Sequence, residues 1–357
     1  MWLTCSSIGR KFVMALTGVC LVLFVTFHCL MNSVALFWPG AYNAICQFLG
    51  ANWYALVASM GLAALFIIHI IYALWLTVQN RKARGNDRYA VNSRPPQVEW
   101  SSKNMLVLGI VVVAFLGLHL VQFWAKMQLQ ELRSHELTAF PVVEGVPADP
   151  QYGTIFLQMA FSQWWTLVVY IIGFVALWFH MNHGFWSMFH TVGWDSNIWI
   201  ERLKKIGCWW TSIVVALFIA QAIVFTVQAN KKYYTTDEAL KVQYVEGLTE
   251  HVQPLVEEFL QEYQPVMQQA QMTGSELPIQ NFIQQKGDYY MSRLEPAVNA
   301  AVAMNATDAN QFLIYAYQIV QQINHYRPSL QPAQQVPAVA LPEAVEETEV
   351  EVEPTNE

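Results

Sequence analysis

Charged residues are scarce in this sequence. Of its 357 residues, 13% are Asp, Glu, Lys or Arg, whereas about a quarter is usual in soluble domains. Hydrophobic residues reach 55% and aromatic residues 14%. This composition excludes an ordinary soluble globule and indicates an integral membrane protein.

The sequence also lacks the cysteine spacings that bind metals or attach haem covalently. Its five cysteines form no Cys-x-x-Cys, no Cys-x-x-Cys-His and no iron–sulfur pattern. A Gly-x-Gly-x-x-Gly dinucleotide fingerprint is missing too. Covalent haem, zinc ribbons and iron–sulfur clusters are therefore not expected in this chain. The cysteines are Cys5, Cys20, Cys29, Cys46 and Cys208.

A net positive charge is absent as well. The formal net charge is −7, and seven glutamates lie in the last fifteen residues. The remainder of the chain is therefore neutral overall, so bulk charge gives no reason to expect nucleic-acid binding.

Long uncharged stretches are present instead. Five of them contain no Asp, Glu, Lys or Arg and are long enough to cross a hydrocarbon layer of about 30 Å at about 1.5 Å per residue. All fourteen tryptophans precede residue 211, and many lie at the ends of these stretches, as in an interfacial belt. We therefore expect an all-α membrane bundle of five transmembrane helices within residues 1–230. The stretches are approximately 12–37, 53–79, 104–125, 164–189 and 206–229.

The first stretch has a second interpretation, a cleavable signal peptide, because basic residues precede it. The apolar run is longer than the usual h-region of about 7–15 residues and contains a histidine, which favours a first span. Beyond the fifth stretch tryptophan disappears, and apolar residues recur at helical spacing. Residues 231–327 are expected to form an extramembrane extension of amphipathic helices, broken near Pro254, Pro265 and Pro278. Residues 328–357, rich in proline and glutamate, are expected to be a disordered acidic tail.

The basic residues predict the orientation of the chain. Eleven of them lie in the N-terminal flank and in the second and fourth connections. The first connection has none, and the third has only Lys126 and Arg133. The positive-inside rule then places the N-terminus in the cytoplasm and, after five spans, the extension outside, which would be the periplasm for a chain in a bacterial inner membrane. The eleven are Arg10, Lys11, Arg81, Lys82, Arg84, Arg88, Arg94, Lys103, Arg202, Lys204 and Lys205.

Each of the first four stretches contains one histidine at a matching depth: His28, His69, His119 and His180. Ionisable residues within a membrane are costly, so they are candidates for function that face the bundle interior. Each is residue sixteen or seventeen of its stretch. Because successive spans run in opposite directions, two layers result, roughly 10–15 Å apart along the membrane normal.

Two neutral imidazoles facing each other can ligate a haem iron on both sides, which suits electron transfer. The expected pairs are His28 with His119 around an outer haem b and His69 with His180 around an inner one. His183 is the alternative fourth ligand, and depth favours His180. Small residues on the spans let a porphyrin approach the backbone or serve ordinary helix packing. These are Gly18, Gly61, Gly109 and Gly173.

The pattern resembles a known family, the cytochrome b membrane anchor of succinate dehydrogenase and quinol:fumarate reductase in its five-helix, two-haem form. The resemblance covers about residues 6–230 and rests on one histidine in each of four spans. His180-Met-Asn-His-Gly184-Phe-Trp186 is similar to the segment of the fourth ligand, and Ser6-Ser-Ile-Gly-Arg10-Lys to the start of Bacteroidetes-type members. The resemblance assigns the fourth ligand to His180.

The resemblance implies two cytoplasmic partners, a flavoprotein subunit with the dicarboxylate site and an iron–sulfur subunit. This chain would pass electrons between the iron–sulfur subunit and the membrane quinone pool, with menaquinone as the expected carrier, and would not itself act on the dicarboxylate. In some members a glutamate lies two residues before the fourth histidine, where this sequence has Trp178. No span contains Asp or Glu, so a carboxylate proton relay is not expected.

The quinone site is predicted less sharply. It requires a hydrogen-bonding side chain near one haem, at a membrane interface. Outer candidates are Asn32, Tyr42, Asn43, Gln47 and Gln122, and inner candidates are Ser6 and Arg10. Two other functions stay open, a cytochrome b subunit of another respiratory oxidoreductase and a haem-free transporter or assembly protein. Two ligands on one helix would favour the former, and absence of haem absorbance the latter.

Overall fold

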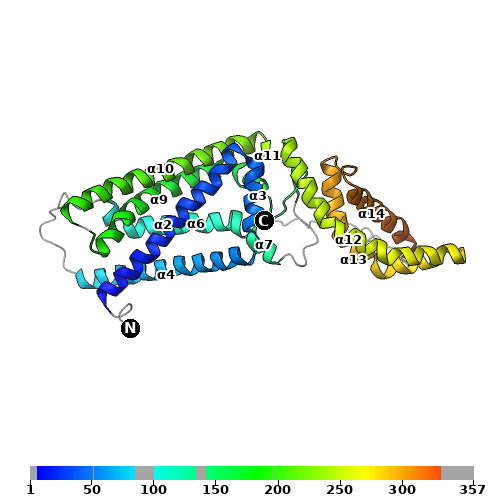
Figure 1. Cartoon of the computed structure of the whole chain (residues 1–357), viewed down its shortest axis with the longest axis horizontal. Coiled ribbons are helices and arrows are strands. Elements are labelled where there is room, and N and C mark those ends of the chain that lie inside the picture. The colour runs from blue at the N-terminus through cyan, green and yellow to red at the C-terminus, as the bar shows by residue number, and fades with distance from the viewer. Residues whose placement is uncertain (1–5, 51, 85–99, 134–141, 195, 331–357) are drawn as a thin grey trace, which may run out of the picture.

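The protein is an all-α membrane bundle with a helical extension at one end (Figure 1). The computed structural model describes residues 6–50, 52–84, 100–133, 142–194 and 196–330. Among these residues, five helices are long and apolar enough to cross a membrane, which confirms the predicted spans. They are α2 (Ser7–Phe37), α4 (Trp53–Arg84), α6 (Met105–His119) with its continuation η1 (Leu120–Trp124), α9 (Trp164–Thr191) and α10 (Asn197–Asn230).

Two spans begin earlier than the uncharged stretches because serine residues cap them. Ser6 Oγ accepts a hydrogen bond from the Gly9 amide at 2.8 Å, and Ser196 Oγ accepts one from the Trp199 amide at 3.4 Å. Such caps satisfy amide groups that have no partner inside the helix. Helices α2 and α10 therefore carry their basic residues on their first turns rather than in loops.

Helix α9 lies at the centre of the bundle, in contact with α2, α6 and α10, while α4 packs mainly on α2. Large apolar side chains on α4 are exposed, among them Met60 at 65% and Ile67 at 55%. In water such a surface would be unfavourable, but hydrocarbon solvates it. The exposed apolar belt is therefore what five lipid-facing spans require.

Short elements close the extension-facing end of the bundle. They include α8 (Gly153–Phe161), which is almost entirely buried although it belongs to a connection that the sequence indicates only as a loop. With nine residues α8 is too short to span a membrane, and it packs against α10, α3 and η1 instead. The others are α3 (Pro39–Leu49), α5 (Trp100–Lys103), which lies at the opposite end, α7 (Gln128–Arg133) and the antiparallel strands β1 (Val142–Val143) and β2 (Val146–Pro147).

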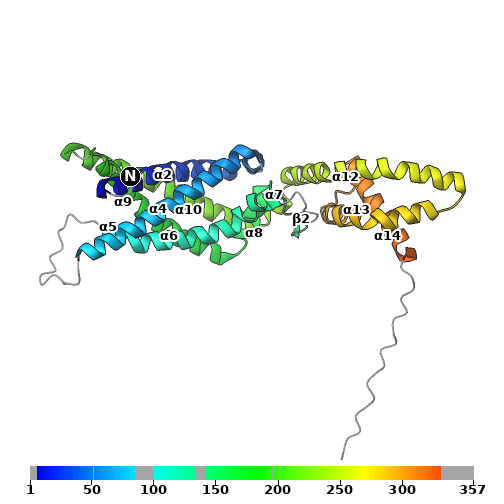
Figure 2. The ribbon, with the colours of Figure 1, turned by 90° about the horizontal axis from the view of Figure 1, so that it is seen from below.

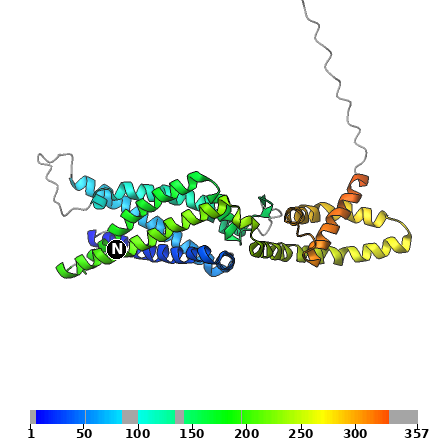
Figure 3. The same cartoon turned by 90° about the horizontal axis from the view of Figure 1, so that it is seen from above.

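The extension comprises α11 (Tyr233–Thr236), α12 (Glu238–Thr273), α13 (Leu277–Ala303) and α14 (Gln311–Leu330). Figures 2 and 3 show that it continues beyond one end of the bundle. The last three helices enclose their own core, which includes Phe259, Tyr290 and Ile323. The first two turns of α12 belong to the bundle instead, because Leu240 and Tyr244 pack in its core.

The expected breaks at Pro254 and Pro265 are wrong, since α12 runs through both residues. Both prolines lie on the exposed side of α12, where water can bind the carbonyl groups that lose their partners. The apolar residues Val252, Val256 and Phe259 on the opposite side hold the helix together. Pro278 does mark a boundary, in the first turn of α13. The expected tail lies outside the described residues from position 331 onward, and residues 328–330 belong to α14.

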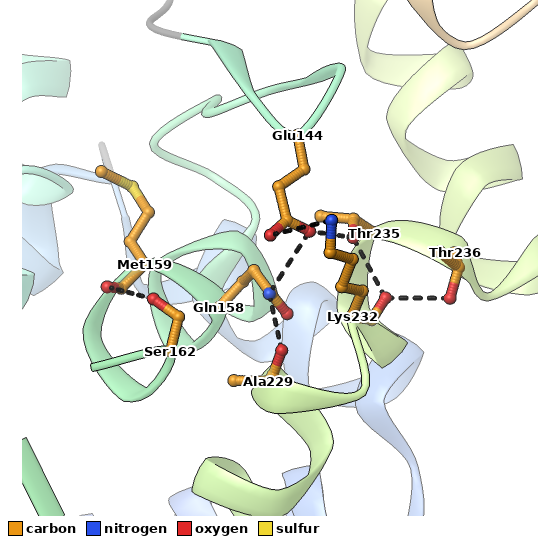
Figure 4. Close-up of polar contacts among 8 residues, drawn as sticks. All are labelled: Glu144, Gln158, Met159, Ser162, Ala229, Lys232, Thr235 and Thr236. Atoms are coloured by element: carbon orange, nitrogen blue, oxygen red, sulfur yellow. Dashed lines mark hydrogen bonds and ion pairs between the residues drawn. The ribbon is translucent and has the colours of Figure 1, made fainter. Parts of the chain in front are cut away.

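A polar cluster fastens the strands to the junction of α10 and α11 (Figure 4). Glu144 pairs with Lys232 at 3.8 Å and accepts a hydrogen bond from Thr235 at 2.9 Å. Gln158 of α8 donates to the carbonyl oxygen of Ala229 at 2.8 Å. Glu144 and Lys232 both have positive φ, 51° and 57°, so these contacts hold two strained turns.

A second polar cluster fixes α12 to the bundle. The Thr154 hydroxyl donates to Asn43 Oδ1 at 2.8 Å and lies 2.8 Å from the Tyr244 hydroxyl. Asn43 Nδ2 donates to Gln243 Oε1 at 3.0 Å. Asn43 and Thr154 are buried, and a buried polar group without its partner costs about 1–3 kcal/mol. The first turns of α12 are therefore anchored rather than loosely attached.

Candidate functional site

The structure brings the four histidines together in two pairs. His28 of α2 faces His119 at the end of α6, with ring centroids 5.8 Å apart and ring planes at 85°. His69 of α4 faces His180 of α9, with centroids 6.3 Å apart and planes at 67°. These are the pairs that the sequence predicts, while their role as haem ligands stays a prediction.

The separation within each pair fits one metal ion between two rings. A metal–nitrogen bond measures about 2 Å, and a ring centre lies about 1.1 Å beyond its nitrogen, so the two centroids should be about 6 Å apart. Both observed separations, 5.8 Å and 6.3 Å, agree with this value. The spacing of the helices would therefore allow both imidazoles of a pair to bind one metal ion.

The separation of the two pairs can be estimated along three helices. On α2, Thr17 contacts His69, and His28 lies eleven residues further along. On α9, Tyr170 contacts His119, and His180 lies ten residues further along. On α6, Gly109 lies against His180, ten residues before His119. At about 1.5 Å per residue, the pairs are about 15 Å apart along the helices.

Two imidazoles supply only two ligands, so a metal held there needs further donors. Among the described residues no group of three or more His, Cys, Asp or Glu side chains is arranged to hold a metal ion. The uncharged stretches that form the membrane-crossing parts of the spans contain no carboxylate. A protein-only zinc site would need about four ligands. The donor set instead fits a metal whose four equatorial ligands come from a macrocycle, as in haem.

Glycines leave space beside the inner pair. A Cβ atom on Gly18 would lie 3.7 Å from His69 Cε1, and one on Gly109 would lie 3.7 Å from His180 Cε1. No side chain therefore separates either backbone from the neighbouring imidazole. The other two glycines differ: Gly173 packs against the Phe115 ring, and Gly61 has nothing within 4 Å. Only Gly18 and Gly109 border the candidate site.

The inner pair has one anchored imidazole. Thr17 Oγ1 lies 3.0 Å from His69 Nδ1 and donates its own proton to the Val13 carbonyl at 2.9 Å. The Thr17 oxygen therefore accepts from His69 Nδ1, which leaves Nε2 of His69 with a free lone pair. His180 Nδ1 is buried and has no hydrogen-bond partner in the described part of the chain. This unsatisfied nitrogen marks a polar site within the apolar bundle.

The outer pair is surrounded by polar side chains. Asn32 Nδ2 lies 3.2 Å from His28 Nε2, and Asn32 Oδ1 accepts a hydrogen bond from Tyr42 at 3.2 Å. His119 Nδ1 lies 3.2 Å from the Tyr170 hydroxyl, which donates to Gln122 Oε1 at 2.8 Å. Ligation through His28 Nε2 requires the Asn32 amide to move aside. In the separation of their rings and in the type of donor atoms, the residues of both pairs fit haem.

The structure sorts the predicted quinone-site residues into different environments. Asn32, Tyr42 and Gln122 lie at the outer pair, within one hydrogen bond of an imidazole or of its partner. Asn43 and Gln47 do not, because they bond to Gln243 and Gln151. On the inner side Ser6 caps α2, and the Arg10 guanidinium lies over the Trp75 ring, 5.4 Å from its centroid. The inner candidates thus have structural roles.

Histidine 183, the alternative ligand, points elsewhere. Its ring lies edge-on against Trp186, with centroids 4.9 Å apart, while His180 faces His69. Trp178, two residues before His180, donates from Nε1 to Ser212 Oγ at 2.9 Å. That position therefore links α9 to α10 in this chain.

Buried carboxyl groups outside the spans lie on the same side as the outer pair. Burial raises the pKa of Glu131 to about 7, with a smaller contribution from Asp149. Burial also raises the pKa of Asp149 to about 6, and Glu250 adds to the effect. These groups, like Thr17 and Tyr170, are not predictable from the sequence, because no spacing distinguishes them from ordinary polar residues.

Searches with protein-family models, curated proteins and solved structures find no match to this chain. The geometry of the two histidine pairs therefore carries the functional argument.

Proposed function

We propose that this chain is a di-haem b membrane anchor that passes electrons between the iron–sulfur subunit of succinate dehydrogenase or fumarate reductase and the membrane quinone. The observation that carries the proposal is the crossed pairing of His28 with His119 and of His69 with His180, at two depths of one bundle. Haem bound there would supply reversible one-electron chemistry at the iron.

The residues of the chain favour electron transfer over ligand chemistry. If haem is bound, each pair would hold its iron with two imidazoles and would leave no position for oxygen or substrate. The side chains around the pairs carry no charge, and the four histidines come from four different helices. The one-per-helix arrangement also argues against a cytochrome b with two ligands on one helix. The packed helices would hold the four imidazoles in place around such a group.

The proposed partners would dock at the end of the bundle opposite the extension. Basic residues gather there, at the start of α2, the end of α4, in α5 and at the start of α10 (Figure 1). By the positive-inside rule this end faces the cytoplasm, and the extension faces the periplasm. A flavoprotein and an iron–sulfur subunit on this face would deliver electrons to the inner pair first.

The quinone would bind on the opposite side, at the outer pair. Asn32, Tyr42 and Gln122 offer amide and phenol groups there, and a quinone oxygen needs one such donor. Menaquinone is the expected carrier. The inner candidates support this choice, since Ser6 and Arg10 already have partners within the helices.

The test uses the full chain purified from membranes with its co-purifying subunits. We expect a reduced-minus-oxidised spectrum with b-type bands, reduction of these bands by succinate and reoxidation by a soluble menaquinone analogue. If dithionite reduces the bands and succinate does not, the proposed partners are wrong and the chain belongs to another respiratory oxidoreductase. A preparation without b-type absorbance would overturn the proposal and favour a transporter or assembly role.

A further inference from the structure

The Tyr170 hydroxyl lies between two polar side chains near the outer pair. It donates to Gln122 Oε1 at 2.8 Å and lies 3.2 Å from His119 Nδ1. Tyr170 is 3% exposed, and its ring makes edge contacts with Phe115 and Phe161 at centroid distances of 5.0 Å and 5.1 Å. The packed ring gives the hydroxyl little freedom to move.

The direction of these hydrogen bonds defines the state of His119. A phenol has one proton, and Tyr170 uses it toward Gln122, so its oxygen can only accept from His119. His119 must then carry its proton on Nδ1, and Nε2 holds the lone pair. Tyr170 would thus select the tautomer in which Nε2 can ligate a metal, as outer partners of metal-binding histidines do.

The backbone at this point provides a second, independent observation. The wide turn η1 begins directly after His119 and contains Gln122. Within it the Ala125 amide bonds to the Leu120 carbonyl at 2.8 Å, five residues back. Such π-turns are rare and occur frequently at functional sites. The π-turn therefore lies in the segment that carries both His119 and Gln122, the two residues that Tyr170 contacts.

The inner pair has a different anchor in the same role. Thr17 accepts from His69 Nδ1, and its own proton goes to a backbone carbonyl. Each pair thus holds one imidazole by an oxygen atom, a phenol in the outer pair and an aliphatic hydroxyl in the inner pair. A hydrogen bond from Nδ1, the imidazole nitrogen that does not bind the metal, raises the basicity of the ligand, which favours ferric over ferrous iron.

We infer that Tyr170, held by Gln122, is a positioning residue that fixes the tautomer and ring orientation of His119 and sets the redox potential of the outer iron independently of the inner one. This inference rests on the proposed function, because it requires haem at both pairs. It goes beyond that function by assigning a different anchor to each layer, Tyr170 for the ligand of the outer iron and Thr17 for the ligand of the inner iron.

The experiment compares Y170F and T17V in the complete membrane complex by potentiometric titration and electron paramagnetic resonance. Both substitutions remove an oxygen and keep nearly the same shape. We expect Y170F to raise the midpoint potential of the outer haem by about 59 mV, equivalent to a tenfold loss of preference for ferric iron. The ferric signal of the outer haem should shift as well. T17V should change only the inner haem.

The outcomes separate this inference from the proposed function. Loss of the outer haem alone in Y170F would also support the inference, because the inner haem reports an intact fold. Two haems with unchanged potentials and signals in Y170F would overturn it and leave the proposed function standing. Loss of both haems in Y170F would overturn it as well, because the hydroxyl would then support the whole bundle. Wild-type complex without haem would overturn the proposed function itself.

Discussion

Replacement of His119 by alanine is expected to remove one haem of two and to leave the other unchanged. The rings of His28 and His119 are 5.8 Å apart, so loss of one ring leaves the iron with a single imidazole. The inner pair lies about 15 Å further along the helices, estimated at about 1.5 Å per residue. Sites more than about 7–10 Å apart usually respond independently to substitution.

The assay measures haem per chain by the pyridine haemochrome method, together with the low-spin ferric signals of the complex. H119A should reduce the haem content from two per chain to one and abolish one of two low-spin signals. H28A should do the same to the same signal, and H69A and H180A to the other one. H183A is the matched control, because its ring faces Trp186 and not a second histidine. Loss of both haems in H119A, or a loss in H183A equal to that in H180A, would refute the pairing.

Three further results follow from the structure. Replacement of Gly109 by leucine should displace His180 and remove the inner haem, whereas the same change at Gly61, which has no neighbour within 4 Å, should leave both haems, as measured by haem content. N43L should loosen α12 by about 1–3 kcal/mol, because it leaves Gln243 Oε1 and the Thr154 amide without a partner, and hydrogen exchange of residues 238–247 should accelerate. The complex should lose thermal stability as the pH rises from about 5 to 8, and E131Q should reduce this loss.

The sign of the pH effect follows from the raised pKa of Glu131. Its ordinary value is 4.5 and its value in the folded protein is about 7. Between these values the folded chain binds more protons than the unfolded chain, so its stability falls as the pH rises. Unaltered pH dependence in E131Q would assign the effect to other groups.

T154V is the control for N43L and should loosen α12 less. In T154V, Asn43 Oδ1 still accepts from the amide of residue 154, and Tyr244 keeps its hydrogen bond to the Tyr234 carbonyl.

Much of the membrane domain is predictable because the bilayer imposes strong constraints. Uncharged stretches of fixed minimum length reveal the spans, and the cost of an ionisable group in lipid makes each intramembrane histidine conspicuous. Alternating chain direction then predicts the partners, and the structure brings His28 to His119 and His69 to His180. Depth in the membrane favours His180 over His183, and in the structure His180 is the one that faces His69.

The remaining features depend on contacts that no local pattern records. Helix α8 is short and apolar, and only its burial against α10 distinguishes it from a loop. Prolines 254 and 265 suggest breaks, but the buried face of α12 outweighs the lost hydrogen bonds. Thr17 contacts His69, 52 positions away in sequence, and Tyr170 contacts His119, 51 positions away. Such pairings arise from tertiary packing.

The most direct test of the two-haem bundle is the stoichiometry and spin state of iron in the purified complex. We expect two b-type haems per chain, each giving a separate low-spin ferric signal typical of two imidazole ligands. A single haem, a high-spin signal at either site or a haem-free chain would contradict it.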